Sequence, residues 1–352
     1  MVTPACEVAV VGAGIVGLAA ACELADAGVD VRCFERAEPG SGQSAGRVRV
    51  FRHMHDRADL VALVAEARAG WDAWSERAGT ELVGGEGVLS AAPDAGDAAR
   101  LLGEAGVEHR WVDEAEQREL LPILAPPLER ALFDVRGGAI RVPAAIRALA
   151  VRIGTRLERA EVLAIRPDGA GAGLVTSAGL RRCDRVLVCA GVETPRLVQP
   201  LGVEIPLAAS LHLRLTFPLR EGAAAELPCW LDRTGVHGSS VYSSPVAELG
   251  GYAVGLAAFD QREEGADAGR VCAYVRRALP GLVPEPAEIR PCWLTVLPWH
   301  GDAFALWRQG PVLAFAGHNL FKLAPVLGRL LAGAARSGSV PAELRPPSPP
   351  AA

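Results

Sequence analysis

Three closely spaced glycines follow an apolar run near the start of the chain. Residues 8–17 are Val-Ala-Val-Val-Gly-Ala-Gly-Ile-Val-Gly, and a helix-compatible apolar segment follows them. Gly12 suits a tight turn, Gly14 lets the backbone approach a pyrophosphate, and Gly17 lets the helix pack flat on a sheet. The helix N-terminus directs free N–H groups and the positive end of its dipole at phosphate. The pattern therefore predicts a βαβ unit that binds a dinucleotide.

A carboxylate stands at the second position that such a unit requires. The next apolar run, residues 31–34, ends at Glu35, which Arg36 follows. A carboxylate at the end of the second strand accepts a hydrogen bond from the ribose 2′-hydroxyl, and its charge disfavours a 2′-phosphate. Gly-rich turns are common, but strand, glycines, helix and Glu35 together favour the nucleotide site over a merely structural turn. The motif by itself does not separate NAD from FAD.

The composition limits the class of protein. The chain has 352 residues, of which 50% are apolar, so it exceeds what one hydrophobic core usually serves and two domains are expected. A net charge of -5 offers no basic stripe, which argues against nucleic acid and anionic membrane surfaces as partners. No apolar run is long enough to span a bilayer, and no charged and apolar leader precedes the nucleotide motif. We therefore expect a cytoplasmic protein.

Cysteine and lysine are distributed in an informative way. The 8 cysteines stand singly, without C-x-x-C pairs or histidines at metal-ligand spacing, so we expect reduced thiols and no metal site. Lys322 is the single lysine among the 36 lysines and arginines. A lysine is a compact point charge that the broad fork of arginine cannot replace in a tight pocket. Lys322 is therefore a candidate functional residue, with chance survival on a solvated helix face as the alternative.

The pattern of the chain changes along its length. From residue 81 to about residue 133, short strand-like pieces alternate with polar helices. Apolar runs at residues 185–191 and 313–317 each end in a small-residue turn, as strands that return beneath a nucleotide do. We therefore predict an α/β fold with a discontinuous, Rossmann-like nucleotide domain and an α+β substrate domain that contains a mixed or antiparallel sheet. The predicted boundaries assign residues 1–81, 135–208 and 298–340 to the first domain, residues 82–134 and 209–297 to the second, and residues 341–352 to a disordered, proline-rich tail.

Hydrophobic periodicity also predicts individual elements. Helices are expected at residues 60–77, 142–154, 268–279 and 320–335. Strands are expected at residues 159–166, 173–177, 211–217, 239–243 and 252–258.

Five segments, in their order and spacing, resemble a known family. They are residues 12–17 with Glu35 and Arg36, residues 49–53, 188–191, 291–295 and 317–325. Together they resemble the flavin amine oxidases, the family of D-amino acid oxidase, glycine oxidase and monomeric sarcosine oxidase, over nearly the whole chain up to about residue 338. The resemblance implies FAD as the cofactor. The residues that it places at the FAD are Gly12, Gly14, Ile15, Gly17, Glu35, Arg36, Ser44, Arg49, Val162, Ala190, Gly191, Cys292, Gly317, Leu320, Phe321 and Lys322.

The resemblance also implies how a substrate binds. In sarcosine oxidase-like proteins an arginine and a lysine hold the substrate carboxylate, and they fall on Arg52 and Lys322. A bidentate fork and a point charge together suit a buried carboxylate. For Arg49 and Arg52, a solvated basic face or phosphate contacts are the alternative. At strand spacing these two arginines face different ways, so we expect one to lie over the flavin and the other to meet the substrate.

Two further positions match the active site of the family. Cys292 falls where the family carries a cysteine joined through sulfur to the flavin ring, a link that would raise the flavin potential and prevent its loss. A small buried hydrophobe is the alternative for Cys292. Tyr242 matches an active-site tyrosine, and a half-buried strand aromatic is the alternative.

The chain departs from the family pattern in two places. An ungapped alignment from Pro245 puts Ala253 where family oxidases keep a lysine that promotes the reaction with oxygen, and its loss should weaken stabilisation of developing superoxide. The turn before Lys322 is two residues shorter than the family form. The shorter turn would place His318 or Asn319 in the pocket, and a structural role is the alternative for each.

These features predict an FAD-dependent enzyme that oxidises the C–N bond of a small carboxylated amine, an amino or imino acid, to an imine by hydride transfer to the flavin. Oxygen is the expected electron acceptor, and the protein is expected to be a monomer or a small homo-oligomer. Ala253 motivates an alternative, a specialised flavoenzyme of secondary metabolism that performs an unusual amine or N–N oxidation or uses another acceptor. A non-catalytic flavoprotein subunit is a second alternative, against which Arg52 and Lys322 argue.

Overall fold

A computed structural model describes residues 6–169, 171–221, 226–235, 240–257, 268–299 and 302–347. The chain divides into two units, each assembled from segments that are far apart in the sequence. Unit 1 comprises Met1–Ala45, Ala144–Ala209 and Trp293–Ala352, and unit 2 comprises Gly46–Pro143 and Ser210–Cys292.

A mainly parallel sheet forms the centre of unit 1. Its strand order is β17-β18-β11-β1-β2-β8, with β10 paired to β11 and β9 paired to β10. Neighbours from β18 to β8 in this order are parallel, whereas β17, β9 and β10 pair antiparallel. The sheet confirms the predicted Rossmann-like fold. Its strands are β1 Cys6–Val11, β2 Val31–Glu35, β8 Leu157–Arg159, β9 Val162–Asp168, β10 Gly171–Thr176, β11 Gly179–Val188, β17 Phe304–Gln309 and β18 Val312–Gly317.

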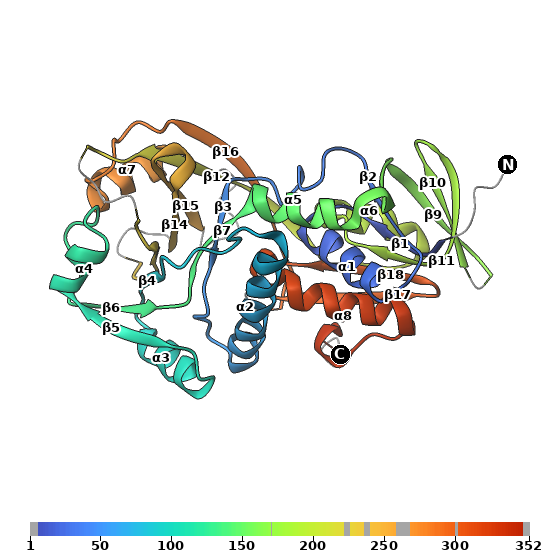
Figure 1. Ribbon diagram of the computed structural model, residues 1–352, viewed down its shortest axis with the longest axis horizontal. Helices are drawn as coiled ribbons and strands as arrows, with labels where there is room; N and C mark the ends of the chain where they lie inside the picture. The colour runs from blue at the N-terminus through green and yellow to red at the C-terminus, as the bar shows by residue number, and fades with distance from the viewer. Residues whose placement is uncertain are drawn as a thin grey trace. The chain divides into compact units, whose positions relative to one another are not determined.

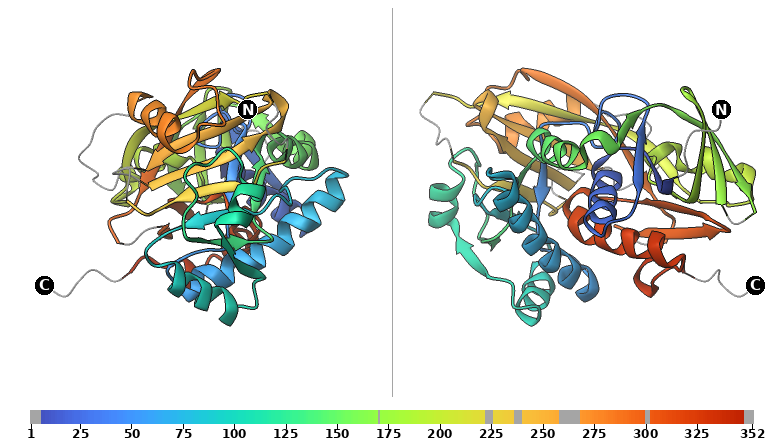
Figure 2. Two further views of the ribbon diagram at one scale, coloured as in Figure 1. Left: turned by 90° about the vertical axis from the view of Figure 1, so that its left-hand side faces the viewer. Right: turned by 45° about the vertical axis from the view of Figure 1, so that its right-hand side comes forward.

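Two helices of unit 1 lie side by side along the sheet, α1 Ile15–Asp26 and α8 Ala324–Ser337 (Figures 1 and 2). Small residues permit their close approach, because a Cβ added at Gly328 would lie 2.8 Å from the Cβ of Ala19. The run Ala19-Ala20-Ala21 on α1 is fully buried. The other described helices that lie wholly or mostly in this unit are α5 Val142–Ile153 and α6 Thr194–Val198.

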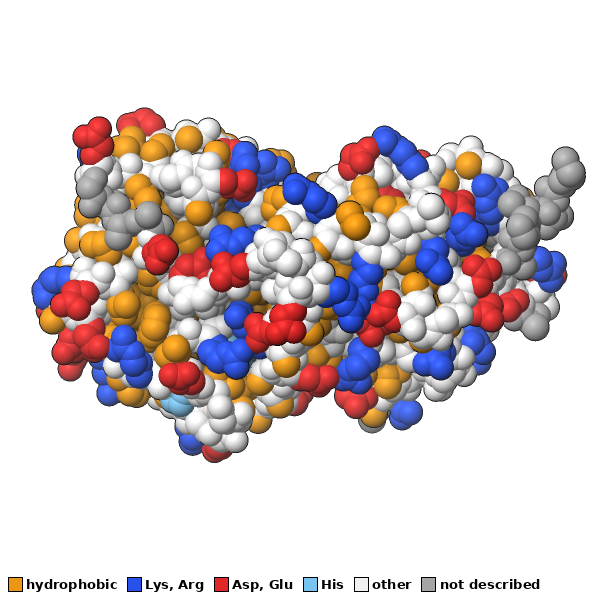
Figure 3. Space-filling model, in the orientation of Figure 1, with side chains coloured by type: hydrophobic (Ala, Val, Ile, Leu, Met, Phe, Trp, Pro, Cys, Tyr) orange, Lys and Arg blue, Asp and Glu red, His pale blue; other side chains and the backbone are white. Residues whose placement is uncertain are grey.

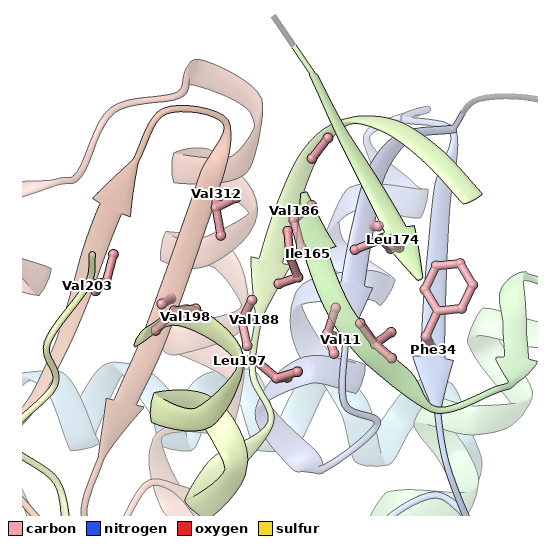
Figure 4. Packing of buried hydrophobic residues seen from close by; sticks show 14 of the residues in the cluster. Val11, Phe34, Ile165, Leu174, Val186, Val188, Leu197, Val198, Val203 and Val312 are labelled. Carbon is pink, nitrogen blue, oxygen red and sulfur yellow. The ribbon is translucent and has the colours of Figure 1, made fainter. Parts of the chain in front are cut away.

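A single apolar cluster supports the sheet of unit 1 from one side (Figure 4). Its members come from β1, β2, the hairpin β9–β10, β11, β18 and α6, so the cluster ties all three chain segments of the unit together. Each such buried aliphatic or aromatic side chain contributes on the order of 1.5–3 kcal/mol of transfer free energy. The labelled members are Val11, Phe34, Ile165, Leu174, Val186, Val188, Leu197, Val198, Val203 and Val312.

A second, mostly antiparallel sheet organises unit 2. Its strand order is β16-β12-β15-β14-β13-β4-β6-β5, in which β13 and β4 are parallel. A separate pair, β3 Val48–Phe51 and β7 Gly138–Arg141, is antiparallel. The mixed sheet confirms the predicted architecture of the second domain. Its strands are β4 Val88–Ala91, β5 His109–Asp113, β6 Arg130–Asp134, β12 Ala208–Pro218, β13 Cys229–Asp232, β14 Ser240–Val246, β15 Gly251–Ala257 and β16 Glu288–Val296.

The helices of unit 2 are α2 Ala58–Ala78, α3 Ala95–Glu104, α4 Glu114–Leu120 and α7 Ala268–Ala278. Helix α2 matches the predicted helix at residues 60–77, and α7 matches the one at residues 268–279. The predicted strands at residues 211–217, 239–243 and 252–258 correspond to β12, β14 and β15, although residues 239 and 258 lie outside the described residues.

The contacts divide the chain differently from the predicted boundaries. Residues 46–81 fall in unit 2, because Val48, Met54 and Val61 pack in one cluster with Val88 and Leu132. Residues 135–143 also fall in unit 2 and residues 293–297 in unit 1. A helix with its own apolar face joins whichever core completes that face, and the local pattern of residues 60–77 does not identify that core.

Two C-terminal predictions need correction. The helix expected from residue 320 begins with a 3-10 turn, Phe321–Leu323, and continues as α8 from Ala324, with Pro325 in its first turn. The tail expected to be disordered from residue 341 contains a second 3-10 turn, Ala342–Leu344, and Leu344 is 0% exposed. Leu344 is anchored because it buries its apolar surface, and the remainder of the predicted tail, residues 348–352, lies outside the described residues.

Acidic and basic side chains are interspersed over the face shown in Figure 3. All eight cysteines carry free thiols. Among the described helices, none is long and apolar enough to cross a membrane.

Candidate functional site

The turn between β1 and α1 in unit 1 accepts only glycine at two positions. Gly12 has φ +100°, and a Cβ there would lie 2.6 Å from the carbonyl oxygen of Cys189. A Cβ at Gly17 would lie 2.0 Å from the carbonyl oxygen of Gly12. Real Cβ atoms do not approach backbone this closely, so these glycines let the turn close against β11 and α1.

The N-terminus of α1 presents bare backbone. Gly14 is the N-cap and makes no side-chain cap hydrogen bond, while the Ile15 N–H donates to Ser44 Oγ at 3.0 Å. A Cβ added at Gly14 would lie 3.2 Å from the same hydroxyl, so a side chain at residue 14 would crowd Ser44. Gly14, Ile15 and Ser44, all among the predicted FAD residues, thus lie together, and the arrangement fits a pyrophosphate at a helix N-terminus.

Glu35 ends β2 beside this turn. Its Oε2 accepts a hydrogen bond from the Ala13 N–H at 2.8 Å, and its Oε1 accepts one from the Ala37 N–H at 3.1 Å. An ionised carboxylate has about four acceptor positions, so a fixed Glu35 retains capacity for a ribose hydroxyl. The neighbouring Arg36 instead pairs with Glu193 at 3.8 Å and is 52% exposed in its side chain.

The remaining predicted FAD residues of unit 1 lie at strand ends and in the core. Ala190 and Gly191 follow β11, and a Cβ at Gly191 would lie 2.2 Å from Gln43 Oε1. Val162 begins β9 and is buried in the apolar cluster of the sheet. Gly317 ends β18 and is followed closely by Leu320, Phe321 and Lys322, which form or adjoin the 3-10 turn. Their contacts with FAD stay a prediction.

Lys322 is held at this turn by two neighbours. Its side chain is 3% exposed, and Nζ donates to Asp302 Oδ2 at 3.2 Å and to the Asn319 carbonyl oxygen at 3.3 Å. The Asn319 Nδ2 in turn donates to Asp302 Oδ1 at 2.9 Å. A buried ammonium is stable only when a counter-ion and hydrogen bonds replace its hydration, and Asp302 and Asn319 supply both.

The backbone at the two neighbours is unusual. Asp302 has φ 57° and Asn319 has φ 56°, and they are the only non-glycine residues with positive φ among those that the structure describes. Asp and Asn tolerate this region better than most residues, but each left-handed residue still costs on the order of 1–3 kcal/mol. Two such residues, hydrogen-bonded to each other and to one lysine, indicate that the turn is shaped around the position of the ammonium.

His318 fixes the same turn from its other side. Its Nδ1 lies 2.8 Å from the Thr295 carbonyl oxygen, and its backbone N–H donates to the Ala303 carbonyl oxygen at 2.9 Å. The Thr295 hydroxyl donates to the Gly317 carbonyl oxygen at 2.7 Å. His318 and Asn319 thus both take part in the structure of the turn, and a catalytic role for either stays a prediction.

In unit 2, two arginines converge on one carbonyl oxygen. Arg49 lies on β3 and Arg214 on β12, and the Nη1 atoms of both donate to the Val48 carbonyl oxygen, at 3.0 and 2.5 Å. Arg214 also lies over the ring of Tyr242, with its Cζ 4.9 Å from the ring centroid. The structure therefore groups two of the predicted residues, Arg49 and Tyr242, around an arginine that was not predicted.

A glycine makes the contact between Arg214 and Tyr242 possible. In the sheet, Tyr242 on β14 pairs with Gly255 on β15, and Gly255 pairs with Arg214 on β12. A Cβ at Gly255 would lie 2.4 Å from the Tyr242 Cζ, so the ring lies across the glycine. We call Arg49, Arg214 and Tyr242 the arginine–tyrosine cluster.

Burial changes the acid–base properties of the cluster. Burial, followed by the positive charge of Arg214, lowers the pKa of Arg49 from its ordinary value to about 10. Burial also raises the pKa of Tyr242 above its usual value of 10. At neutral pH the arginine is therefore charged and the tyrosine hydroxyl is protonated, so both are hydrogen-bond donors.

Of the two other predicted residues of this region, Cys292 contacts the cluster and Arg52 has different partners. The Cys292 Sγ lies on β16 at 3.8 Å from the Arg49 Nη2. Arg52 follows β3, where its Nη1 donates to the Met54 carbonyl oxygen and lies 3.5 Å from His55 Nδ1. Cys292 is thus a neighbour of Arg49, whereas Arg52 has other partners. The flavin link of Cys292 and the carboxylate contact of Arg52 stay predictions.

A buried, hydrogen-bonded pair of side chains follows Arg52 in unit 2. His53 accompanies it in the sequence motif, and its Nδ1 lies 2.9 Å from Asp134 Oδ1 while its backbone N–H donates to Asp134 Oδ2 at 2.7 Å. Both side chains are buried, so this pair fixes the segment after β3. Arg52 therefore lies on a segment that is anchored on both sides.

Three residues of these arrangements were missed by sequence reasoning. Arg214 had no signal of its own, because it stands in the polar phase of the strict alternation at residues 211–217, where a solvent-facing side chain is expected. Asp302 had a weak signal, since a single buried lysine requires a nearby carboxylate. Gly255 had none, because its role depends on the register of three strands.

Comparisons with known proteins agree with this geometry. A family model described as FAD dependent oxidoreductase matches residues 7–334. The peroxisomal sarcosine oxidase of Homo sapiens is 28% identical over 92% of this chain and 90% of its own length. In fold, the chain is similar to NikD, described as an unusual amino acid oxidase essential for nikkomycin biosynthesis, with a TM-score of 0.84, 21% identity and 98% of both chains covered.

A further solved structure shows the same fold. The L-proline dehydrogenase from P. horikoshii aligns with a TM-score of 0.83 at 20% identity, over 96% of this chain and 95% of that one. The family match covers both units of the chain, including the glycine turn, Glu35 and the Lys322 turn. The chain therefore belongs to the family of FAD dependent oxidoreductases, and FAD is its cofactor.

Proposed function

We propose that this enzyme oxidises the C–N bond of a small amine that carries a carboxylate, with oxygen as the electron acceptor. The relative from Homo sapiens supports the substrate class, because sarcosine is an N-methylated amine that bears a carboxylate. FAD, when bound, supplies the hydride acceptor for the carbon that bears the nitrogen, and the product is an imine.

The observation that carries this proposal is the position of Lys322. It is the only lysine of the chain, it is 3% exposed, and two left-handed residues, Asp302 and Asn319, fix its ammonium. An ion fixed in advance attracts a carboxylate without having to be reorganised during binding. Asp302 keeps the ammonium charged and in place between turnovers, so in this proposal it is a positioning residue.

The family resemblance assigns Arg52 to the same carboxylate, and we propose this role as well. Its guanidinium lies on a segment that the buried His53–Asp134 pair anchors, which supports a defined position for its fork. A bidentate guanidinium would orient the carboxylate, whereas Lys322 would supply a point charge. Tyr242, whose hydroxyl is protonated at neutral pH, is the candidate donor to the substrate.

The test replaces Lys322 without leaving a buried carboxylate unpaired. The double substitution Lys322→Met with Asp302→Asn removes both charges, so the holoenzyme should fold and retain its flavin. We expect its KM for a carboxylated amine to rise about 10- to 100-fold, the effect of losing one charge-assisted hydrogen bond. Arg336→Met, on the exposed end of α8, is the matched control and should leave KM unchanged. An unchanged KM in the double variant would contradict the role of Lys322.

A second candidate function is favoured by Ala253. This residue occupies the position at which the family resemblance expects an oxygen-activating lysine, and it is buried in an apolar cluster with Cys229 and Val246. An apolar site provides no fixed charge for developing superoxide. The candidate is a specialised biosynthetic enzyme that passes its electrons to another acceptor. Mixing reduced enzyme with oxygenated buffer separates the two functions, because reoxidation at the rate of an ordinary flavin oxidase would exclude the second.

A further inference from the structure

We propose that the arginine–tyrosine cluster of unit 2 binds an acidic group of the substrate, in addition to the carboxylate assigned to Lys322. This inference rests on the proposed function and predicts that, within its substrate class, amines that carry two carboxylates are preferred. The cluster consists of Arg49, Arg214 and Tyr242, and no residue of unit 1 is needed to define it.

The central observation is the state of Arg214. Its side chain is buried, with 8% of the residue exposed, and its Nε has no hydrogen-bond partner among the residues that the structure describes. Its described contacts are the Val48 carbonyl oxygen and the face of the Tyr242 ring, neither of which carries a charge. A buried guanidinium with an unused N–H is an unsatisfied cation, and a group of opposite charge would satisfy it.

A second cation lies close to the first. Arg49 and Arg214 donate to the same carbonyl oxygen, and the charge of Arg214 contributes to lowering the pKa of Arg49. That direction means that the two guanidinium groups repel each other in the folded protein. The ring of Tyr242 offsets part of the repulsion by a cation–π contact. A carboxylate between the two would convert the repulsion into two charge-assisted interactions.

The geometry of the cluster is fixed before any ligand binds. Tyr242, Gly255 and Arg214 are successive partners across three strands, and only the missing side chain at Gly255 allows the ring to reach the guanidinium. Rigid strands hold binding groups more accurately than loops do. Two planar forks and a phenolic hydroxyl match the donors that a planar carboxylate accepts.

The phosphates of FAD are a poorer match to this site. The pyrophosphate of FAD already has a site of its own, the glycine turn at the N-terminus of α1. An acidic group on the substrate is therefore the ligand that we assign. If Arg214 instead served the flavin ring, its removal would change the absorption spectrum or the reduction potential of the flavin rather than substrate preference.

The test compares two substrates that differ only in one charge. N-methylaspartate and its carboxamide, N-methylasparagine, are supplied to the holoenzyme in both the D and the L form. We expect kcat/KM for the aspartate to exceed that for the asparagine at least about tenfold, and Arg214→Gln to reduce this ratio about 10- to 100-fold. Arg233→Gln is the control, because Arg233 also belongs to unit 2 but pairs with Asp94 at 3.2 Å, and it should preserve the ratio.

Binding without oxidation provides an independent measurement. Succinate and its monoamide, succinamate, are titrated into the oxidised holoenzyme while the flavin absorbance is recorded. Succinate should bind the wild type at least about tenfold more tightly than succinamate does, and Arg214→Lys should reduce the difference because it keeps the charge and loses the fork.

The outcomes separate the two proposals. If neither N-methyl amino acid reduces the flavin but succinate is preferred, the proposed function fails and the anion site stands. If both are oxidised with equal kcat/KM, or if Arg214→Gln lowers both equally, the anion site is excluded and the proposed function stands. If the substitutions at Arg214 prevent folding, the preference of the wild type decides, and the absence of a preference for the second charge overturns the inference.

Discussion

Lys322 in unit 1 and Arg214 in unit 2 are both buried cations, but they have different surroundings. Lys322 donates to the carboxylate of Asp302 at 3.2 Å and to the carbonyl oxygen of Asn319 at 3.3 Å, and both of these residues are left-handed. Arg214 contacts a carbonyl oxygen and an aromatic ring, and its neighbour Arg49 carries the same charge. Lys322 therefore has a counter-ion within the protein, whereas Arg214 and Arg49 repel each other.

The difference separates two uses of a buried charge. A paired ion such as Lys322 is held in one position, and the energetic penalty of burial is met within the protein. A buried cation such as Arg214, whose Nε has no partner among the described residues, raises the free energy of the protein until an anion binds, so it favours binding of an anionic ligand. Unit 1 thus provides a fixed point charge, and unit 2 provides a cluster that we expect to discriminate substrates by charge.

The largest effect is expected from breaking the pair in unit 1. Asp302→Asn removes the charge that balances Lys322, and breaking one side of a buried ion pair costs about 3–5 kcal/mol. Urea unfolding of the holoenzyme should show a loss of this size, and adding Lys322→Met to the same chain should restore much of it. A loss below about 1 kcal/mol for Asp302→Asn alone would mean that the pair contributes no more than an exposed ion pair does.

The next effect concerns the glycine beneath Tyr242. Gly255→Ala places a methyl group where the ring now lies, and overpacking of this kind costs about 1–3 kcal/mol. The free energy of unfolding should fall by this amount in the wild type. In a Tyr242→Ala background the same substitution should cost almost nothing, because the clash is removed. An equal cost in both backgrounds would show that the ring does not need the space at Gly255.

Removal of the unpaired cation should matter less for stability. Arg214→Met gives up the hydrogen bond to Val48 and the contact with Tyr242, but it also ends the repulsion of Arg49, so we expect a change within about 1 kcal/mol. Thermal unfolding with and without succinate measures this change in stability. Succinate should raise the melting temperature of the wild type more than that of Arg214→Met. A loss of several kcal/mol in Arg214→Met would mean that Arg214 is a structural residue like Asp302.

The smallest effect is expected at a half-exposed pair near the cluster. The Arg47 guanidinium donates two hydrogen bonds to Glu288, at 3.0 and 3.1 Å, and holds the pKa of that carboxyl below its ordinary value of 4.5, with a smaller contribution from Arg290. The pair therefore stabilises the fold fully above pH 4.5 and loses this contribution as the pH falls through the lower native pKa.

Its contribution should be about 0.5–1 kcal/mol after solvent screening. Glu288→Gln should lower the free energy of unfolding by this amount at neutral pH. At a pH below the native pKa of Glu288 the variant and the wild type should be equally stable, because both then lack a charge at residue 288. A difference that grows as the pH falls would contradict the direction of the pKa shift.

Short-range patterns in the sequence predicted the nucleotide half well. The glycine turn and Glu35 lie close together in the sequence, and Gly12 and Gly17 are required by the close backbone contacts of the βαβ unit. The predicted α/β fold, the FAD cofactor and the family are confirmed. The contacts place residues 46–81 in unit 2, whereas the sequence pattern assigned them to the nucleotide domain, because a local apolar pattern does not identify the core against which a helix packs.

The contacts that distinguish Lys322 from Arg214 could not be predicted from the sequence. The Asp302–Lys322 pair depends on two left-handed residues whose conformation no local propensity requires. The contact of Arg214 with Tyr242 depends on strand register, and a shift by one residue would turn both side chains to the other face. Sequence motifs identified Lys322, Arg49 and Tyr242 as candidates, but only the three-dimensional structure shows their partners.

The most direct test of the account is anaerobic titration of the oxidised holoenzyme with carboxylated amines, followed by the flavin absorbance. The account predicts that sarcosine and N-methylaspartate bleach the flavin, whereas N-methylglycinamide, which lacks the carboxylate of sarcosine, does so at least about tenfold less efficiently. If no carboxylated amine bleaches the flavin, or if the amide is as efficient as sarcosine, the assignment of a carboxylated amine as the substrate is wrong.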